Sequence, residues 1–502
     1  MNGCSHPARV LLVGLCAAQV LATTQVFLSN THLYQDLIAM RDAGYLVIPN
    51  QRVMPNLTGF GPAFFGGLFF TLSAGAGLSL LSLGAAWVWD RLLCRKKTVL
   101  ILFMLLWTGG LLPVNRHGLC PLMSAYFLVI PPLVFVAALR WMPSQARQGD
   151  WFSRIVLFGP VLVLALLWIP QMNTHLFTDL RDNLLLSNPL GRKINDFYYA
   201  YTLYPAEVFK SFEQKTLRTC SLEGIRERSA RQALERVLIS YDCLPIAGNV
   251  AVDLNITGKG NTLVFEHRGR TILRTAAEEF YANPGAALQE FSSRTDRHGF
   301  FRHFTFFSLL MGFPLGLYLC LYAVIHLVSC LFLDKSTSRV TTSVVCFLIC
   351  AVLFFVFSHR RVTEIDLKDV FQALESEHWQ ERVAALKLIE KRGMEIGDSQ
   401  AYQRMLKSPH IPERYWLARA LGVSRRPETY KDLLAFLDDP HHNVVCMAFY
   451  ALGQRGDSRA VKEILKRIEI SDDWYSQWYA YKALRCLGWK QTRSKSGLCS
   501  YP

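Results

Sequence analysis

Arg116 and His117 form a basic pair in a short turn between two apolar stretches, where they could meet a lipid phosphate at a membrane surface. A run of aromatic residues includes Tyr201 and is followed by Glu207, so hydroxyl groups and a carboxylate could line one pocket. Together these side chains suit an enzyme that acts on a lipid or a lipid-linked substrate. Simpler explanations are a polar interhelical turn for the basic pair and a headgroup-level belt or core position for the tyrosines.

The common catalytic and metal-binding motifs are absent from the sequence. It contains no HExxH, P-loop, GxSxG, dinucleotide glycine motif or haem-attachment CxxCH. Asp179 and Asp182 are one helical turn apart but form only an isolated DxxD pair. His441 and His442 lack partners at metal-ligand spacing. We therefore expect no metal and no cofactor, and the sequence favours a protein that is not an enzyme, although it leaves the question open.

A dense group of aromatic residues follows Asp472 and Asp473. A single helix cannot bury five large rings against one neighbour, so some of them should face a protein partner, the membrane surface or the segment 171–300. The alternative is that they cap the end of the helical array described below. The group consists of Trp474, Tyr475, Trp478, Tyr479 and Tyr481.

Cys220 and Cys243 are the only cysteines between residues 171 and 300. In an oxidising compartment a disulfide between them would stabilise the fold by about 3 kcal/mol. They flank a predicted helix at 221–241, and a straight helix of about twenty residues would hold its ends roughly 30 Å apart, too far for a disulfide. The disulfide therefore requires a shorter or bent helix; the alternative is two buried thiols.

Apolar stretches set the framework that must position these residues. A helix needs about 20 apolar residues to cross a membrane, and 51% of the sequence is hydrophobic. Stretches near that length, free of Asp, Glu, Lys and Arg, predict about seven spans, at 10–28, 60–89, 98–114, 119–139, 155–170, 304–333 and 340–358. We interpret the first as a retained anchor, with a cleaved signal peptide as the alternative.

The distribution of basic residues predicts an orientation. With a cytoplasmic N-terminus, the inner short loops carry far more Lys and Arg than the outer ones, which hold only Arg41, Arg52 and Arg116. The basic residues His359, Arg360 and Arg361, which follow the last span, run against this rule. This orientation puts residues 171–300 and 362–502 on the same, outer side.

The composition and charge pattern argue against two functional classes, nucleic-acid-binding proteins and ion-coupled transporters. The net charge of +15 would suit a nucleic-acid partner, but no basic run exceeds Arg95–Lys97 and no zinc-finger or RNP pattern is present. Basic inner loops explain part of the charge, so we expect no nucleic-acid partner. No carboxylate lies within the predicted spans, which argues against an ion-coupled transporter.

Residues 171–300 have the composition of a small soluble α+β module. Apolar periodicity predicts helices at 177–187, 194–214 and 221–241, the second broken or begun afresh at Pro205. The period then changes to two, which predicts antiparallel strands near 250–257, 262–266 and 271–274.

A repeat of 31 or 32 residues occupies the C-terminal part, with Leu388, Ala420, Ala451 and Ala483 at equivalent positions. The best unit runs from Leu437-Asp438-Asp439-Pro440 through Asn443-Val444-Val445 to Ala451-Leu452-Gly453. This unit resembles the short bacterial HEAT repeat. The resemblance covers the C-terminal quarter and implies an α-solenoid that binds a protein.

These observations predict a mainly α protein: a polytopic membrane bundle with a small α+β extramembrane module and a C-terminal HEAT-like α-solenoid. The expected function is a membrane-anchored scaffold or assembly factor on the outer, periplasmic face of a bacterial inner membrane, in contact with lipid and a protein partner. The alternative is a polytopic membrane enzyme acting on a lipid or lipid-linked substrate. The predicted parts are 1–170 and 301–361 in the membrane, 171–300, 362–490 and a tail at 491–502.

The predicted orientation can be tested with reporters fused after Tyr501. Alkaline phosphatase, which folds only outside the cytoplasm, should be active there, and a cytoplasm-dependent fluorescent protein should be dark. A fusion after Arg140, in a predicted inner loop, is the control and should give the opposite pattern. Cytoplasmic activity at Tyr501 would refute the count of seven spans.

Overall fold

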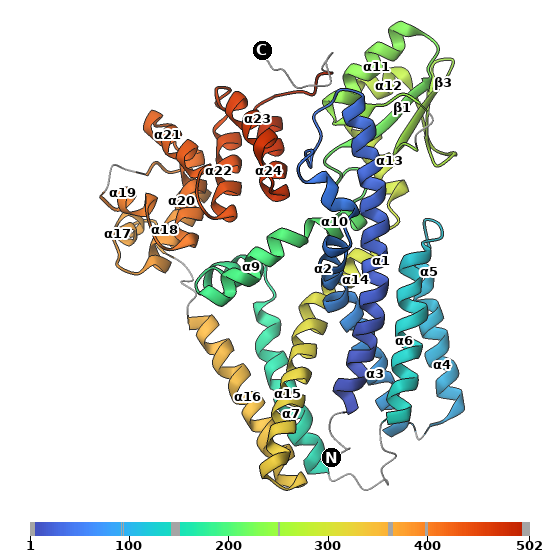
Figure 1. The fold of residues 1–502 in the computed structure, drawn as a ribbon, viewed down its shortest axis with the longest axis vertical. Coiled ribbons are helices and arrows are strands. Elements are labelled where there is room, and N and C mark those ends of the chain that lie inside the picture. The colour runs from blue at the N-terminus through green and yellow to red at the C-terminus, as the bar shows by residue number, and fades with distance from the viewer. Residues whose placement is uncertain are drawn as a thin grey trace.

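The computed structural model describes residues 6–91, 93, 95–141, 151–248, 251–359, 365–396 and 400–493. The chain is mainly helical, as predicted. A small sheet and a stack of paired helices lie beyond the same end of an elongated helical bundle (Figure 1). The predicted boundary at 361–362 and most of the predicted tail at 491–502 lie outside the described residues.

Apolar helices form the bundle, in which α1 packs against α2, α3 and α6. Short π-helical turns join α2 to α3 at Thr71–Gly75 and α14 to α15 at Ser308–Gly312. The helices are α1 (His6–Asp42), α2 (Phe60–Phe70), α3 (Ala76–Arg91), α4 (Lys97–Gly109), α5 (Leu111–Val114), α6 (Pro121–Trp141), α7 (Trp151–Trp168), α14 (Gly299–Phe307), α15 (Phe313–Phe332) and α16 (Lys335–His359).

Six helical segments of the described residues are long and apolar enough to cross a membrane. The predicted span at 155–170 falls on α7, which meets the same standard only together with the helix that follows it across a bend of 107°. With that bent pair, up to seven segments could cross. The six are Pro7–Asp42, Phe60–Asp90, Lys97–Val114, Pro121–Trp141, Gly299–Phe332 and Thr337–Ser358.

Helix α1 extends well beyond the apolar stretch at 10–28 and runs unbroken to Asp42. Glycines on α2 and in the π turn before α3 allow this part of the chain to lie directly against it. A Cβ added at Gly75 would come within 2.4 Å of the Ala18 Cβ, and one at Gly67 within 3.0 Å of the Thr23 backbone nitrogen. Helix α1 is therefore the packing centre of the bundle.

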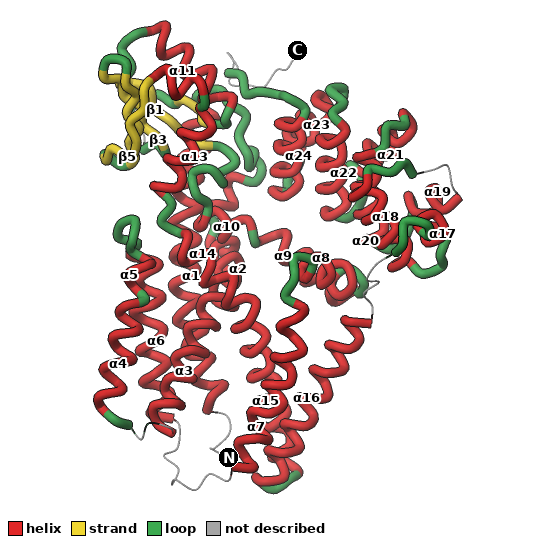
Figure 2. Tube along the Cα trace, turned by 180° about the vertical axis from the view of Figure 1, so that it is seen from behind, coloured by secondary structure: helices red, strands yellow, loops and turns green. Residues whose placement is uncertain are grey.

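The 171–300 segment begins with helices that lie across the upper end of the bundle, followed by a five-stranded sheet (Figures 1 and 2). The strand order is β2-β1-β3-β4-β5; β1 pairs in parallel with β2 and β3, and the remaining pairs are antiparallel. The elements are α8 (Leu176–Leu180), a π turn η4 (Arg181–Leu185), α9 (Pro189–Tyr201), α10 (Leu203–Phe209), β1 (Arg218–Gly224), α11 (Arg228–Ser240), β2 (Cys243–Pro245), β3 (Leu254–Lys259), β4 (Thr262–His267), β5 (Arg270–Ala276), α12 (Ala277–Ala282) and α13 (Pro284–Thr295).

Two predicted helices of this segment need correction. The helix predicted at 221–241 begins only at Arg228, because residues 218–224 form β1, in which buried Cys220 and Leu222 alternate with Ser221 and Glu223. The break predicted at Pro205 in the helix at 194–214 falls earlier, at Thr202 between α9 and α10, and the second helix ends at Phe209. The predicted antiparallel meander is confirmed as β3, β4 and β5.

The C-terminal part is a stack of helix pairs, which we call the array. The second helices of the pairs, α18, α20, α22 and α24, lie side by side. Glycines permit this packing: a Cβ added at Gly422 would lie 2.9 Å from the Ala451 Cα, and one at Gly453 2.9 Å from the Ala483 Cα. The helices are α17 (Val370–Leu374), α18 (Trp379–Arg392), α19 (Gln400–Leu406), α20 (Ile411–Val423), α21 (Pro427–Phe436), α22 (His442–Arg455), α23 (Ala460–Ile470) and α24 (Trp474–Cys486).

The close approach of α22 and α24 predicts the effect of a larger side chain. Gly453→Val should lower the free energy of unfolding by about 1–3 kcal/mol, because the new side chain would overlap the backbone of α24. Gln454→Val, at the exposed next position of the same helix, is the matched control and should change it little. Thermal unfolding of both full-length variants in detergent measures the difference; equal melting temperatures would contradict the predicted packing.

Candidate functional site

The membrane bundle, the 171–300 segment and the helical array meet around Trp474, the first residue of α24. Its indole packs edge-on against the ring of Tyr204 in α10, with ring centroids 5.1 Å apart. Asp473 caps α24 by accepting a hydrogen bond from the Ser476 backbone N–H. We call this region, centred on Trp474 and Tyr204, the junction.

The loop between α1 and α2 is hydrogen-bonded to the end of the array. The side-chain amide of Asn50 donates to the carbonyl oxygens of Ile468 and Ser471 at 2.8 and 2.9 Å, at the end of α23. The Asn50 backbone N–H donates to the Gln477 side chain at 2.7 Å. These bonds satisfy carbonyl groups that a helix end leaves without partners.

A second contact joins α24 and the residues after it to the sheet and to the loop between α1 and α2. The Tyr481 hydroxyl donates to Asp242 at 2.6 Å, and Arg485 pairs with the same carboxylate at 3.2 Å. Gln491 both accepts from the backbone N–H of Leu46 and donates to its carbonyl oxygen. Burial, followed by the Asp242 carboxylate, raises the pKa of Tyr481 well above its usual value, so its hydroxyl remains a donor.

The second helices of the array also rest on α8, η4 and α9. The Trp416 indole N–H donates to Asp182 at 2.8 Å, and Lys387 lies 3.2 Å from the same carboxylate. Asn195 of α9 donates to the Asn443 side chain at 2.9 Å. Farther along α9, the ring of Tyr199 packs on Tyr475, with centroids 4.6 Å apart.

An open groove of about 410 Å³ lies on one side of Trp474, between the array, α9, α10 and the start of α2. Its walls carry aromatic rings and its rim carries carboxylates, a combination that suits a cationic side chain or headgroup. The lining residues are Val53, Asn56, Pro62, Asp196, Tyr199, Ala200, Tyr201, Leu203, Tyr204, His442, Asp472, Asp473 and Trp474.

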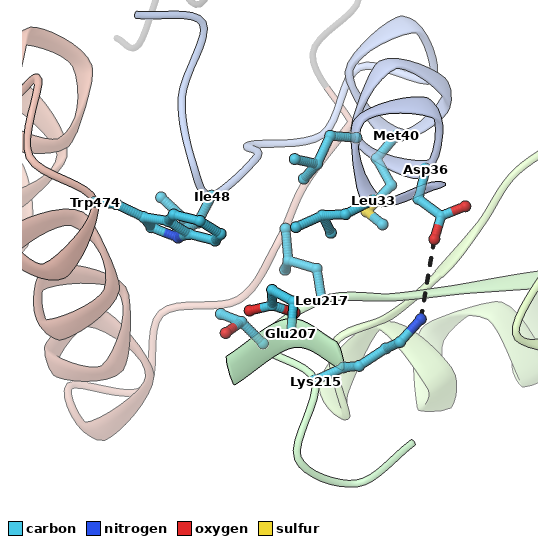
Figure 3. Close-up of a pocket in the computed structure, with 10 residues that line it drawn as sticks. Leu33, Asp36, Met40, Ile48, Glu207, Lys215, Leu217 and Trp474 are labelled. Carbon is cyan, nitrogen blue, oxygen red and sulfur yellow. Dashed lines mark ion pairs between the residues drawn. The ribbon is translucent and has the colours of Figure 1, made fainter. Parts of the chain in front are cut away.

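Trp474 also lines a second, smaller cavity (Figure 3). Its volume of about 10 Å³ is enough for roughly one water molecule. Asp36 of α1 and Lys215 point toward each other there, 3.9 Å apart, and Glu207 also lines the cavity. This cavity is too small for a substrate, and its charged groups join α1 to the sheet segment.

Lys215 forms a closer ion pair with Asp253, at 2.6 Å. Burial by itself favours the neutral lysine, but the carboxylates of Asp253 and Asp36 outweigh it, so the pKa of Lys215 lies above its usual value. Burial likewise works against the Asp253 carboxylate, but Lys215 and hydrogen bonds to Thr219 leave the pKa of Asp253 below its usual value. Both groups are therefore charged at neutral pH.

The structure separates the residues that suggested lipid chemistry. Tyr201 lines the open groove and Glu207 lines the small cavity. Arg116 and His117 are exposed in the turn after α5 and line neither cavity.

The five aromatic residues of the last unit lie mainly against the chain itself. Trp474 and Tyr481 are buried, and Tyr475 packs on Tyr199. Trp478 is half-buried, with the Lys482 ammonium 3.6 Å from its ring centroid, and Tyr479 is half-buried beside it. The sequence allows these rings to face a protein partner, the membrane surface or the 171–300 segment, or to cap the array. In the structure, Trp474, Tyr475 and Tyr481 contact the 171–300 segment.

Cys220 and Cys243 lie buried on the neighbouring parallel strands β1 and β2, as free thiols. Because α11 carries the chain back to the same end of the sheet, the two cysteines are not held a helix length apart. Burial, with Cys243 beside it, raises the pKa of the Cys220 thiol well above its usual value. A disulfide between them stays a prediction.

Sequence patterns gave no sign of Asn50, Asp242 or Gln491. Each is a single polar residue in a loop, and its partner lies hundreds of residues away. Among the described residues, no group of three or more His, Cys, Asp or Glu side chains is arranged to hold a metal ion.

Comparisons with known proteins find one similarity. Residues 399–485 match the family model of HEAT repeats, which confirms the resemblance in the C-terminal part. No curated protein and no solved structure matches the chain.

The buried ion pair predicts a destabilising substitution. Lys215→Met leaves the Asp253 carboxylate without its counter-charge and should cost about 3 kcal/mol of stability. Lys215→Met/Asp253→Asn should recover most of this loss, and Lys431→Met, at an exposed position of α21, is the control. Melting temperatures in detergent measure all three.

The pH dependence follows from the pKa directions. Asp253 contributes stability above its unfolded pKa near 3.8 and loses it as pH falls through its lower folded pKa. Lys215 contributes stability below its unfolded pKa of 10.5 and loses that contribution as pH rises through its higher folded pKa. Burial raises the pKa of Asp36 to about 7, and Lys215 opposes this rise, so Lys215→Met should raise the pKa of both Asp36 and Asp253 in the folded protein. The difference in stability between wild type and Lys215→Met should therefore be largest at alkaline pH below 10.5 and shrink as pH falls through neutrality. A difference of the same size at acid, neutral and alkaline pH would contradict the ion pair.

Proposed function

We propose that this protein is a membrane-anchored scaffold or assembly factor that binds a protein partner through its HEAT repeats. The observation that carries the proposal is the match of residues 399–485 to HEAT repeats, which generally mediate protein interactions. The array rests on the end of an apolar bundle, so whatever it binds would be held at the membrane.

The open groove beside Trp474 is the best supported contact site for that partner. Asp196 and Asp472 are exposed at its rim, and Tyr201 and Trp474 line its wall. Carboxylates beside aromatic faces recognise Lys and Arg side chains by charge and by cation–π contact. We infer that a basic segment of the partner enters here, with Trp474 as one wall of the site.

The outer face of a bacterial inner membrane is the location that the basic residues support. Lys and Arg gather in the loops at the end of the bundle away from the array, such as Arg95, Lys96 and Lys97. The array and the sheet lie beyond the opposite end (Figure 2). The seven-span arrangement that this location requires counts α7 as one crossing, with the chain turning away from the span at the 107° bend before α8.

The alternative, an enzyme that acts on a lipid or lipid-linked substrate, has narrower support. Of its four candidate residues, only Tyr201 lines a space large enough for a ligand. Arg116 and His117 would have to act elsewhere.

The proposal can be tested in living cells with a photo-crosslinking amino acid at Tyr201. A discrete protein adduct should form there, and Asp472→Lys should weaken it several-fold because the rim then repels a basic segment. Glu428→Lys reverses an exposed charge on α21, outside the groove, and should leave the adduct intact.

Two results would count against this use of the groove. An adduct with the mass of a lipid at Tyr201 would favour the lipid alternative over the scaffold. A protein adduct equally insensitive to Asp472→Lys and Glu428→Lys would show that the partner is not recognised by the carboxylates of the groove.

A further inference from the structure

Helix α9 has an apolar side that the described chain leaves largely exposed. Leu190, Ile194 and Phe197 are 70%, 53% and 40% exposed. Their spacing of four and three residues puts them on one side of the helix. Exposed apolar side chains gathered in this way mark a surface that is covered in the working protein.

The opposite side of α9 faces the array. Asn195 is 2% exposed and hydrogen-bonded to Asn443, and Tyr199 lies on Tyr475. Helix α9 is therefore amphipathic, with one side paired to protein and the other open.

The path of the chain brings this open side to the level where the apolar bundle ends. The chain turns by 107° between α7 and the α8–η4 segment, so it leaves the direction of the spans. In Figures 1 and 2, α9 runs across the upper ends of α7 and α16, beneath the array. A helix lying across the ends of the spans would lie in the plane of a membrane surface.

The apolar side of α9 continues onto a bundle helix. The ring of Phe197 meets Phe65 of α2 edge-on, with centroids 5.8 Å apart, and Phe65 is itself 38% exposed. Phe177 and Leu184, in α8 and η4, add further exposed apolar side chains, at 47% and 44%. The open side of α9 thus joins the outer surface of the bundle instead of forming an isolated patch.

The charges on α9 also suit a lipid surface. Lys193, one residue before Ile194, is exposed next to the apolar side of the helix. Lys and Arg beside the apolar side of an interfacial helix reach the phosphates of the headgroup layer.

We propose that α9 is an interfacial helix whose Leu190, Ile194 and Phe197 enter the upper acyl region of a lipid bilayer while its other side carries the array. This inference rests on the membrane insertion of the bundle in the proposed function, and not on the protein partner. The array is then fastened to the lipid surface through α9 as well as to the bundle through Asn50.

The experiment uses the full-length protein in nanodiscs of phosphatidylethanolamine and phosphatidylglycerol. A genetically encoded fluorescent amino acid is placed at Ile194, and its quenching is measured with lipids that carry a nitroxide near the top of the acyl chain and with aqueous iodide. The matched control on the same helix is Asp196, which is exposed at the groove. Glu428, on α21, reports the water-exposed array.

The nitroxide lipid should quench the probe at position 194 several times more strongly than at 196 or 428, and iodide should show the reverse order. Quenching of position 194 by iodide as strong as at 428 would overturn the proposal. Protection of position 194 from both quenchers would also overturn it, because a second copy or another protein would then cover α9.

A probe at Leu353, exposed on α16, separates this inference from the proposed function. If nitroxide lipids carrying the label at any depth fail to quench position 353, the membrane insertion of the bundle fails. If they quench 353 but not 194, the bundle is in the membrane and the interfacial helix alone is wrong.

Discussion

The side-chain amide of Asn50 is the contact on which the arrangement of the whole chain depends. It donates to backbone carbonyls at the end of α23, more than 400 residues later in the chain, and the backbone of the same residue is held by Gln477. Separating the two parts would exchange these hydrogen bonds for bonds to water, at a cost of about 0.5–1.5 kcal/mol for each. A different docking that buried the same groups without partners would cost about 1–3 kcal/mol for each group. The array therefore has one favoured orientation on the bundle, and the groove beside Trp474 exists only in that orientation.

The parts of the fold that sequence patterns predicted correctly are those set by local period. The apolar stretches and the repeat of 31 or 32 residues each depend on the regular spacing of residue types along the sequence. The β1 strand was missed because its pairing is decided at a distance: Cys220 lies opposite Pro245 on one side and Leu254 on the other. The helical period of α11 was extended backward across it, since nothing in residues 218–224 alone specifies two parallel neighbours.

The junction was predictable in its residue types but not in its geometry. Tyr201, Glu207 and Trp474 each stood out as chemistry-bearing or aromatic, yet their distribution between two cavities depends on where α24 meets α10. Asp242 could not be foreseen, because a single acid in a turn has no pattern, and its partners Tyr481 and Arg485 come from the far end of the chain. The match to HEAT repeats identifies the architecture of the array and leaves its contacts to the structure.

Helix α1 links these parts mechanically. As one unbroken helix of 37 residues, it is about 55 Å long at 1.5 Å per residue. Its upper end carries Asp36, which faces Lys215 of the sheet segment, and leads directly into the loop of Asn50. One continuous helix therefore carries the contact with the sheet segment, leads into the contact with the array and packs at the centre of the apolar bundle, so the three parts share a single rigid rod.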